Sequence, residues 1–410
     1  MKTYQMPKTL ADLLLLMSVW WFGSYIYEYV LKDGLKPLYS YIVVISLTGM
    51  YVVSQTNSRL KISALGDRWI RIILAWLIAH VALGMLAYFE SSKSEVAVQS
   101  LITLIEVSLV GASFVILMAN PRRNRQVATA FVLLALFSTG MDVYDFVVPT
   151  FTNVAGRAAG LYVNPTTAGY MIVMAMMGGL GTVRKRLQWL FILVCGIGVL
   201  ITFTRSAWIM WGISAAWFGM QGKSLTASKR FFAIITSTVF GIGILIALFA
   251  GDVGALIEQT PLARYLDPNT MARLGIGASS LSGDSSRQRL AVIQFSLKAI
   301  SQNPLFGHGI GYTNEWAFPV GPHNMYLLFM IDGGTVGLLL YLSLMYLLWK
   351  SSLGVGRIIA LQIIIAGLFS HNLLDQPSVV MIMAYVVTHG AISRQQHARI
   401  ANPGLKAVVA

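Results

Sequence analysis

The sequence predicts an all-α protein that crosses a membrane about twelve times, if each crossing takes roughly 20 apolar residues. The first observation is composition: 56% of the 410 residues are hydrophobic and only 11% are charged, whereas soluble domains carry roughly 25% charged residues. The mean hydropathy of +0.68 agrees with this. The second observation is that long apolar runs recur along the whole chain. The third is that short basic clusters separate these runs, which is typical of the ends of transmembrane helices.

The apolar runs define the predicted spans. They cover residues 9–30, 38–55, 70–89, 97–118, 126–141, 165–183, 187–203, 206–221, 230–251, 323–349, 356–371 and 374–393. The last two runs nearly touch, so a tight hairpin is predicted between them. The first run has no small-residue cleavage site after it, and we interpret it as a retained span.

The positions of lysine and arginine predict the orientation. Most of the 30 basic residues fall in segments on the same side as the N-terminus, which places both termini in the cytoplasm. In this scheme residues 1–251 hold transmembrane helices 1–9 and residues 252–322 form a large loop on the outer face. Residues 323–393 hold helices 10–12, and residues 394–410 form a cytoplasmic tail. The net charge of +14 lies in these short clusters, so no nucleic-acid partner is predicted.

The loop at 252–322 differs from the other connections, which are short. Its segment Arg289–Gln302 has apolar residues at helical spacing and predicts a helix. Pro304 ends that helix, and glycines follow at 307, 309 and 311. Long ordered loops in compact proteins are usually functional.

Motifs for metals and cofactors are missing from the sequence. The single cysteine, Cys195, lies in an apolar run, so neither a disulfide nor a cysteine metal site is predicted. No set of carboxylates or histidines has metal-ligand spacing, and no glycine-rich phosphate loop is present. We therefore expect no metal and no cofactor.

His323 is the first candidate for chemistry. It stands in Gly-Pro-His-Asn-Met-Tyr at 321–326, where the long loop enters the tenth predicted span, and Asn324 follows it. A neutral imidazole at the outer interface is a plausible general base. The alternative is a histidine that only caps or anchors the helix.

Several arginines are predicted on the outer side, against the usual charge bias. Arg157 precedes Asn164 and the sixth span, Arg205 lies between the seventh and eighth spans, and Arg287 and Arg289 begin the loop helix. Guanidinium groups bind phosphate in a bidentate manner, so together these arginines predict a site for a pyrophosphate-bearing lipid. Interface anchoring or ion pairs with Asp142, Asp145 or Asp284 would be the structural alternative.

Three more ionisable residues lie near the outer ends of the last spans. Asp332 lies in the tenth span beside Gly333 and Gly334, and His371 and Asp375 are at the predicted outer hairpin. An ionisable residue at membrane depth is costly and is a functional candidate by default. For Asp332 a structural hydrogen bond between helices is an equal alternative.

Four segments together resemble the O-antigen ligase/polymerase superfamily. They are His323-Asn324-x-x-Leu327 with an acid at 332 and glycines at 334 and 337; Arg289 followed by Pro304, Gly307 and Gly309; Thr204–Trp208; and Gly156–Pro165. The resemblance covers residues from about 120 to 375, in the family's order and topology. One departure is Asp332, where many members have glutamate, so only a carboxylate is carried over.

The resemblance implies a GT-C-like glycosyltransferase of the bacterial inner membrane with its active site facing the periplasm. Its partners would be membrane lipids, a glycan donor linked to undecaprenyl pyrophosphate and, for a ligase, a lipid A-core acceptor. The implied catalytic residues are His323, Arg289 and Arg205. The implied substrate-binding residues are Arg157, Arg287, Asn164, Asn324, Asp332 and Asp375.

Other functions remain open at this point. A polymerase of the same superfamily would extend a lipid-linked glycan, although about twelve spans with a large loop after the ninth favour the ligase. A flippase would also need many spans and phosphate-binding arginines, but its charged residues should line the membrane midplane. The clustering of charged candidates on one face argues against both a flippase and a purely structural scaffold.

Overall fold

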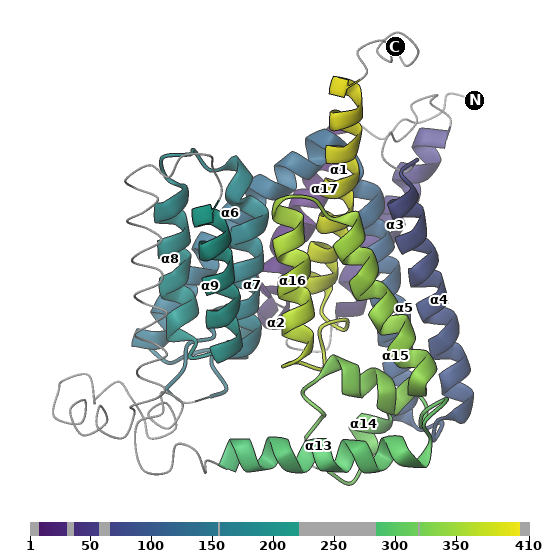
Figure 1. Ribbon diagram of the computed structural model, residues 1–410. Helices are drawn as coiled ribbons and strands as arrows, with labels where there is room; N and C mark the ends of the chain where they lie inside the picture. Colours follow the sequence, from purple (N-terminus) through teal and green to yellow (C-terminus); the bar gives the residue numbers. More distant parts are fainter. Residues whose placement is uncertain are drawn as a thin grey trace, which may run out of the picture. The chain divides into compact units, whose positions relative to one another are not determined.

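The computed structural model describes residues 8–30, 37–56, 66–154, 156–220, 284–318 and 320–401 (Figure 1). All of the regular structure in these ranges is helical, and they contain no strand. The chain divides into two compact units. The first comprises residues 1–130 and 295–410, and the second comprises residues 131–294. Each unit is described by itself.

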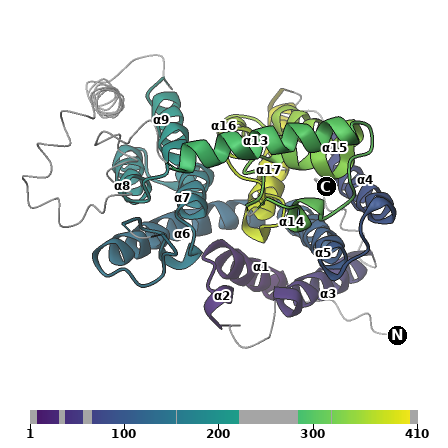
Figure 2. The same cartoon turned by 90° about the horizontal axis from the view of Figure 1, so that it is seen from below.

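The first unit is built from long helices around α5. Its helices are α1 (Lys8–Gly23), α2 (Tyr27–Val30), α3 (Pro37–Thr56), α4 (Arg68–Glu90), α5 (Glu95–Met118), α14 (Tyr312–Glu315), α15 (Met325–Ser351), α16 (Val355–Gly367) and α17 (Pro377–Ala401). Helix α6 (Pro121–Val147) begins in this unit, and α13 (Asp284–Gln302) ends in it. Helix α5 packs against α3, α4 and α17 (Figure 2). Its fully buried residues Val110, Phe114 and Met118 form part of the core, and the Phe114 ring meets the Phe22 ring of α1 edge to face at 6.2 Å.

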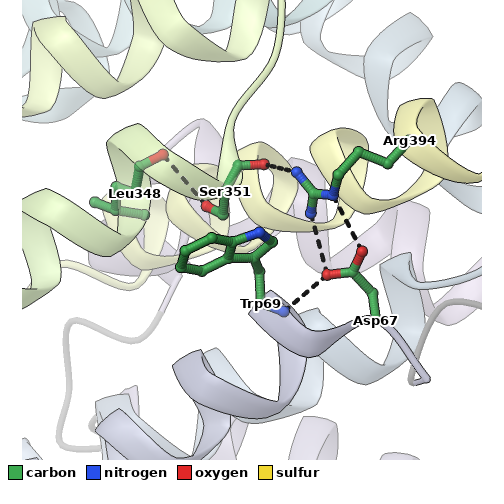
Figure 3. A network of polar contacts seen from close by, with 5 residues as sticks. All are labelled: Asp67, Trp69, Leu348, Ser351 and Arg394. Atoms are coloured by element: carbon green, nitrogen blue, oxygen red, sulfur yellow. Dashed lines mark hydrogen bonds and ion pairs between the residues drawn. The ribbon is translucent and has the colours of Figure 1, made fainter.

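A polar network joins three helices at one end of this unit (Figure 3). Arg394 of α17 donates from Nε and Nη2 to the Asp67 carboxylate, at 3.1 Å each, and from Nη1 to the carbonyl oxygen of Ser351 at 2.6 Å. Asp67 also caps α4 by accepting from the backbone N–H of Trp69 at 2.8 Å. The network fixes the start of α4 to the ends of α15 and α17. The starts of α5, α15 and α17 therefore lie at the opposite end of the unit.

The second unit has an almost fully buried helix at its centre. It contains the remainder of α6, the short helices η1 (Gly160–Tyr162) and η2 (Leu180–Thr182), α7 (Pro165–Gly179), α8 (Gln188–Ile201), α9 (Arg205–Met220) and the first part of α13. Helix α7 is buried along nearly its whole length and packs against α8 and α9 (Figure 1). A helix that is apolar on all sides is typical of a protein interior or a membrane span.

The described helices agree with the predicted spans in position. Every predicted span except 230–251 falls on a helix, while 230–251 and the loop segment 252–283 lie outside the described residues. Within the described ranges, α4, α5, α6 and α15 are the 4 helices long and apolar enough to cross a membrane. Shorter apolar helices occur at 11–23, 39–52, 188–201 and 355–367. The predicted helix in the long loop is present and begins at Asp284, five residues earlier than expected.

Some predicted boundaries are wrong because apolar runs do not show where the backbone leaves the helix. The tight hairpin between the last two spans is absent, since α16 ends at Gly367 and α17 begins at Pro377, with a loop between them. Bonds from the N–H groups of Leu368 and Phe369 to carbonyls three residues earlier close α16. The first span is interrupted after Gly23, where Tyr25 has φ 62°. Helix α15 is broken at Gly334, which has φ 62° and ψ −156°.

Candidate functional site

The break in α15 is filled by the glycine-containing loop at 304–311. The N–H of His308 donates to the carbonyl of Ile331 at 2.9 Å, and the N–H of Gly309 donates to the carbonyl of Asp332 at 3.0 Å. In the other direction, the N–H of Thr335 donates to the carbonyl of Pro304 at 2.8 Å. Buried backbone groups need partners, and here the loop and the broken helix provide them for each other.

Two glycines make this close approach possible. A Cβ on Gly307 would lie 2.6 Å from the carbonyl oxygen of Asp332. A Cβ on Gly334 would collide with the Leu305 carbonyl, and both glycines have positive φ. The segments 304–307 (Pro-x-x-Gly) and 332–334 (Asp-Gly-Gly) therefore pack directly against each other.

Asp332 lies inside this arrangement. Its Oδ2 accepts from the N–H of Gly311 at 3.3 Å, and its Oδ1 is buried with no partner among the described residues. This hydrogen bond runs to the glycine loop and not to a neighbouring long helix. Asp332 thus holds the loop to the broken end of α15.

His323 stands immediately before α15 in a strained conformation. Its φ is 49°, a left-handed value that is uncommon for residues other than glycine and is often found at functional sites. The following residue, Asn324, caps α15 by accepting from the N–H groups of Tyr326 at 2.8 Å and Leu327 at 3.1 Å. The His323 side chain is exposed. The cap therefore fixes the backbone immediately after His323, whose imidazole is accessible.

The loop between α16 and α17 brings two more predicted residues to the same end of the unit. The His371 ring meets the His323 ring edge to face, with centroids 5.1 Å apart. Burial, and secondarily His323, lowers the pKa of His371 to about 4. Dense surrounding protein raises the pKa of Asp375 to about 6. At neutral pH His371 is therefore uncharged, and most of Asp375 is ionised.

A cavity of about 760 Å³ opens beside these residues. Its walls come from α4, α5, α14, α15, α17 and the loop before α17, all in the first unit. His371, Asp375 and Asp332 line it, together with Glu95, Gln99 and Asn314. Most of the other lining residues are apolar and include Leu77, Val107 and Leu344. The structure thus places Asp332, His371 and Asp375 around one cavity and puts His323 in contact with its wall.

In the second unit, Asp145 organises the loop that carries Arg157. Its Oδ1 accepts from the N–H groups of Thr150 at 2.9 Å and Phe151 at 2.7 Å. Its Oδ2 accepts from Ala159 at 2.9 Å and Gly160 at 3.1 Å. A carboxylate that accepts several backbone N–H bonds fixes the surrounding loop.

Arg157 links this loop to the next one. It is buried, and it donates from Nε to the carbonyl of Thr202 at 2.8 Å and from Nη2 to Thr204 Oγ1 at 2.6 Å. Arg205 follows directly, exposed at the first residue of α9. Asn164 is exposed and caps α7 by accepting from the N–H of Thr166 at 2.8 Å. The structure therefore brings the Gly156–Pro165 and Thr204–Trp208 segments together.

The other predicted arginines, Arg287 and Arg289, lie in α13, but their side chains are outside the described part of the structure. All four candidate arginines belong to the second unit, whereas His323 belongs to the first. Among the described residues, no group of three or more histidine, cysteine or acidic side chains is placed to hold a metal ion.

Sequence reasoning missed several residues of these sites. No role for His308 is predicted from the sequence, yet its Nε2 donates to the Ala299 carbonyl at 2.8 Å and its ring stacks on the Tyr312 ring with centroids 4.2 Å apart. Glu95 and Gln99 were also missed. Their spacing of four, at the start of an otherwise apolar helix, is a signal that could have identified them.

The helices and their apolar lengths define the class: this is a multi-pass, all-helical membrane protein. Residues 189–342 match the family model described as O-antigen ligase. This match agrees with the resemblance that the motifs of the sequence predicted. No curated protein and no solved structure matches it.

Proposed function

We propose that the protein is an O-antigen ligase, which transfers a glycan from undecaprenyl pyrophosphate to lipid A-core at the periplasmic face of the inner membrane. The observation that carries this proposal is the family match over 189–342, a range that contains Arg205, Arg289, His323 and Asp332. The exposed imidazole of His323 beside a large cavity supports the same conclusion. The proposal includes a GT-C-like fold and cytoplasmic termini.

In the proposed mechanism, the oxygen of an acceptor hydroxyl attacks the anomeric carbon of the donor glycan. His323 accepts the hydroxyl proton as the new bond forms. The bond from the anomeric carbon to the pyrophosphate breaks, and undecaprenyl pyrophosphate leaves with the electron pair. A single displacement of this kind inverts the anomeric configuration, and the activated donor supplies the energy.

The arginines are proposed to bind the donor pyrophosphate and to stabilise the charge that develops on it, without a metal ion. Arg205, which is exposed at the start of α9, and Arg289 are assigned this role directly, with Arg287 beside Arg289. Arg157 shapes the loop before Arg205 through its bonds to Thr202 and Thr204. Asn164 and Asn324 cap helices at the two sites, and Asp332 and Asp375 are proposed to support substrate binding.

Transfer by the purified protein tests this function. The protein is incubated with undecaprenyl-pyrophosphate-linked glycan and lipid A-core, in EDTA and without nucleotide, and products are separated by size. Glycan attached to lipid A-core is the expected result. Elongation of the donor with no change in lipid A-core would favour a polymerase. Movement of donor across a proteoliposome membrane with no covalent product would favour a flippase.

A further inference from the structure

We propose that the cavity of the first unit binds the sugar portion of the acceptor and excludes the donor pyrophosphate. This inference rests on the proposed function and assigns one of its two substrates to a place in the fold. The cavity volume of about 760 Å³ lies within the range of roughly 300–1,000 Å³ that is usual for small-molecule sites.

The chemistry of the cavity's polar end matches hydroxyl groups. Glu95, Gln99, Asn314 and Asp375 all line the cavity with exposed side chains. Carboxylates accept hydrogen bonds from hydroxyl groups, and amides both donate and accept them. Sugar hydroxyls need partners of both kinds.

The charge of the cavity distinguishes sugar from phosphate. No lysine or arginine is among its described lining residues, whereas Glu95, Asp332 and Asp375 are. A pyrophosphate placed there would meet carboxylates and no compensating cation, and a charge buried without a partner is strongly unfavourable. The candidate arginines all belong to the second unit, and none is among the described residues that line the cavity.

Three polar residues of α5 face the cavity, and of these Thr103 also donates from Oγ1 to the Gln99 carbonyl at 2.9 Å. Glu95, Gln99 and Thr103 are spaced four apart and therefore lie on one face of the helix, and all three line the cavity. Polar side chains on an apolar membrane helix are costly unless they face a cavity or a partner. A ligand rich in hydroxyl groups would supply the partner.

The cavity is also connected to the proposed base. His371 lines it, and the His371 ring contacts the His323 ring with centroids 5.1 Å apart. On another side, α14 contacts α5 and the turn before it. Asn314 Nδ2 donates to Ser100 Oγ of α5 at 3.4 Å, and Ser92 Oγ of the turn donates to the Glu315 carboxylate at 2.6 Å. An acceptor sugar held here would present its hydroxyl on the side of the cavity that His323 contacts.

Cysteine protection tests the site without requiring catalysis. The only native cysteine, Cys195, is buried, so Gln99→Cys would introduce one accessible thiol into the full-length protein. We expect a maleimide to label it, and we expect the phosphate-free oligosaccharide of the acceptor to slow labelling at least about fivefold, as roughly 80% occupancy would. Inorganic pyrophosphate should have no effect. Val98→Cys is the matched control, because Val98 is exposed on the same helix and does not line the cavity.

The possible results distinguish failure of the proposed acceptor site from failure of the proposed ligase function. Labelling of Gln99→Cys that is unaffected by the acceptor oligosaccharide, or slowed only by the donor glycan or by pyrophosphate, would overturn the proposal even if transfer occurs. Protection without transfer would instead leave the site in place and remove the proposed function. In a transfer assay, Gln99→Leu should raise the acceptor KM about 3–10-fold, the loss expected for one hydrogen bond, with an unchanged donor KM. An unchanged acceptor KM would contradict the site.

Discussion

Asp142 and Asp145 lie three residues apart in α6, but only one of their carboxylates is hydrogen-bonded. Asp145 accepts four backbone hydrogen bonds, whereas both carboxylate oxygens of Asp142 are buried with no partner among the described residues. The position of a charged residue in the sequence did not distinguish them. The sequence offers both as ion-pair partners for the outer arginines, and the described side chains show no such pair.

Asp145→Asn should therefore destabilise the protein, while Asp142→Asn should not. The amide Nδ2 cannot accept hydrogen bonds, so two backbone N–H groups lose their partner, at about 1–3 kcal/mol each. Asp142→Asn leaves an equally unpartnered polar group and should change stability by less than about 1 kcal/mol. Thermal unfolding of the two variants in detergent measures the difference. Equal effects would show that the Asp145 bonds do not hold the loop.

The shifted pKa values of Asp375 and His371 predict opposite effects of pH on the stability of the protein. The raised pKa of Asp375, about 6, means that its stability contribution is present below its unfolded pKa and is lost as pH rises through about 6. The lowered pKa of His371, about 4, means that its contribution is present above its unfolded pKa and is lost as pH falls through about 4.

Asp375→Asn should then be more stabilising, relative to the wild type, at about pH 8 than at about pH 4.5. Because the carboxylate is open to the cavity, the difference should be no more than about 1 kcal/mol. Melting temperatures of both proteins across this range provide the measurement. A difference that grows toward low pH would show that the Asp375 pKa is not raised.

At the scale of elements, the break in α15 is the feature that the apolar pattern could not reveal. The run at 323–349 predicted a continuous span, and most of its residues are helical. Yet the backbone leaves the helix at Gly334 to accommodate the 304–311 loop. Hydropathy reports the environment of side chains and is insensitive to one non-helical residue. Both glycine-containing segments can be recognised in the sequence, but their packing depends on contacts between residues that are far apart in the sequence.

Neighbouring glycines in α15 offer a matched test of this break. Gly334→Ala should destabilise the protein by roughly 1–3 kcal/mol or more, because φ is positive and the new Cβ would collide with the Leu305 carbonyl. Gly333→Ala should be neutral or slightly stabilising, since nothing lies within 4 Å of its Cβ position. Detergent melting curves compare the two variants. Similar melting temperatures would mean that the loop does not pack into the break.

At the scale of the whole molecule, composition and hydropathy were sufficient to predict a multi-pass helical membrane protein. The motifs were sufficient to predict a resemblance to the O-antigen ligase family, and residues 189–342 match that family model. The cavity and the polar face of α5 could not be predicted in this way, because they depend on how α4, α5, α15 and α17 pack. The roles of His323 and the arginines remain predictions.

The most direct test of the central claim compares the wild type with His323→Asn in the transfer assay. Asparagine tolerates the left-handed backbone of residue 323 better than most residues do, so the variant should fold in normal amounts and melt normally. Removal of a general base typically costs about 10²–10⁴-fold in rate. We predict that the wild type modifies lipid A-core and that folded His323→Asn does so at least about 100-fold more slowly. Transfer at the wild-type rate by the folded variant would contradict the assignment of His323 as the base.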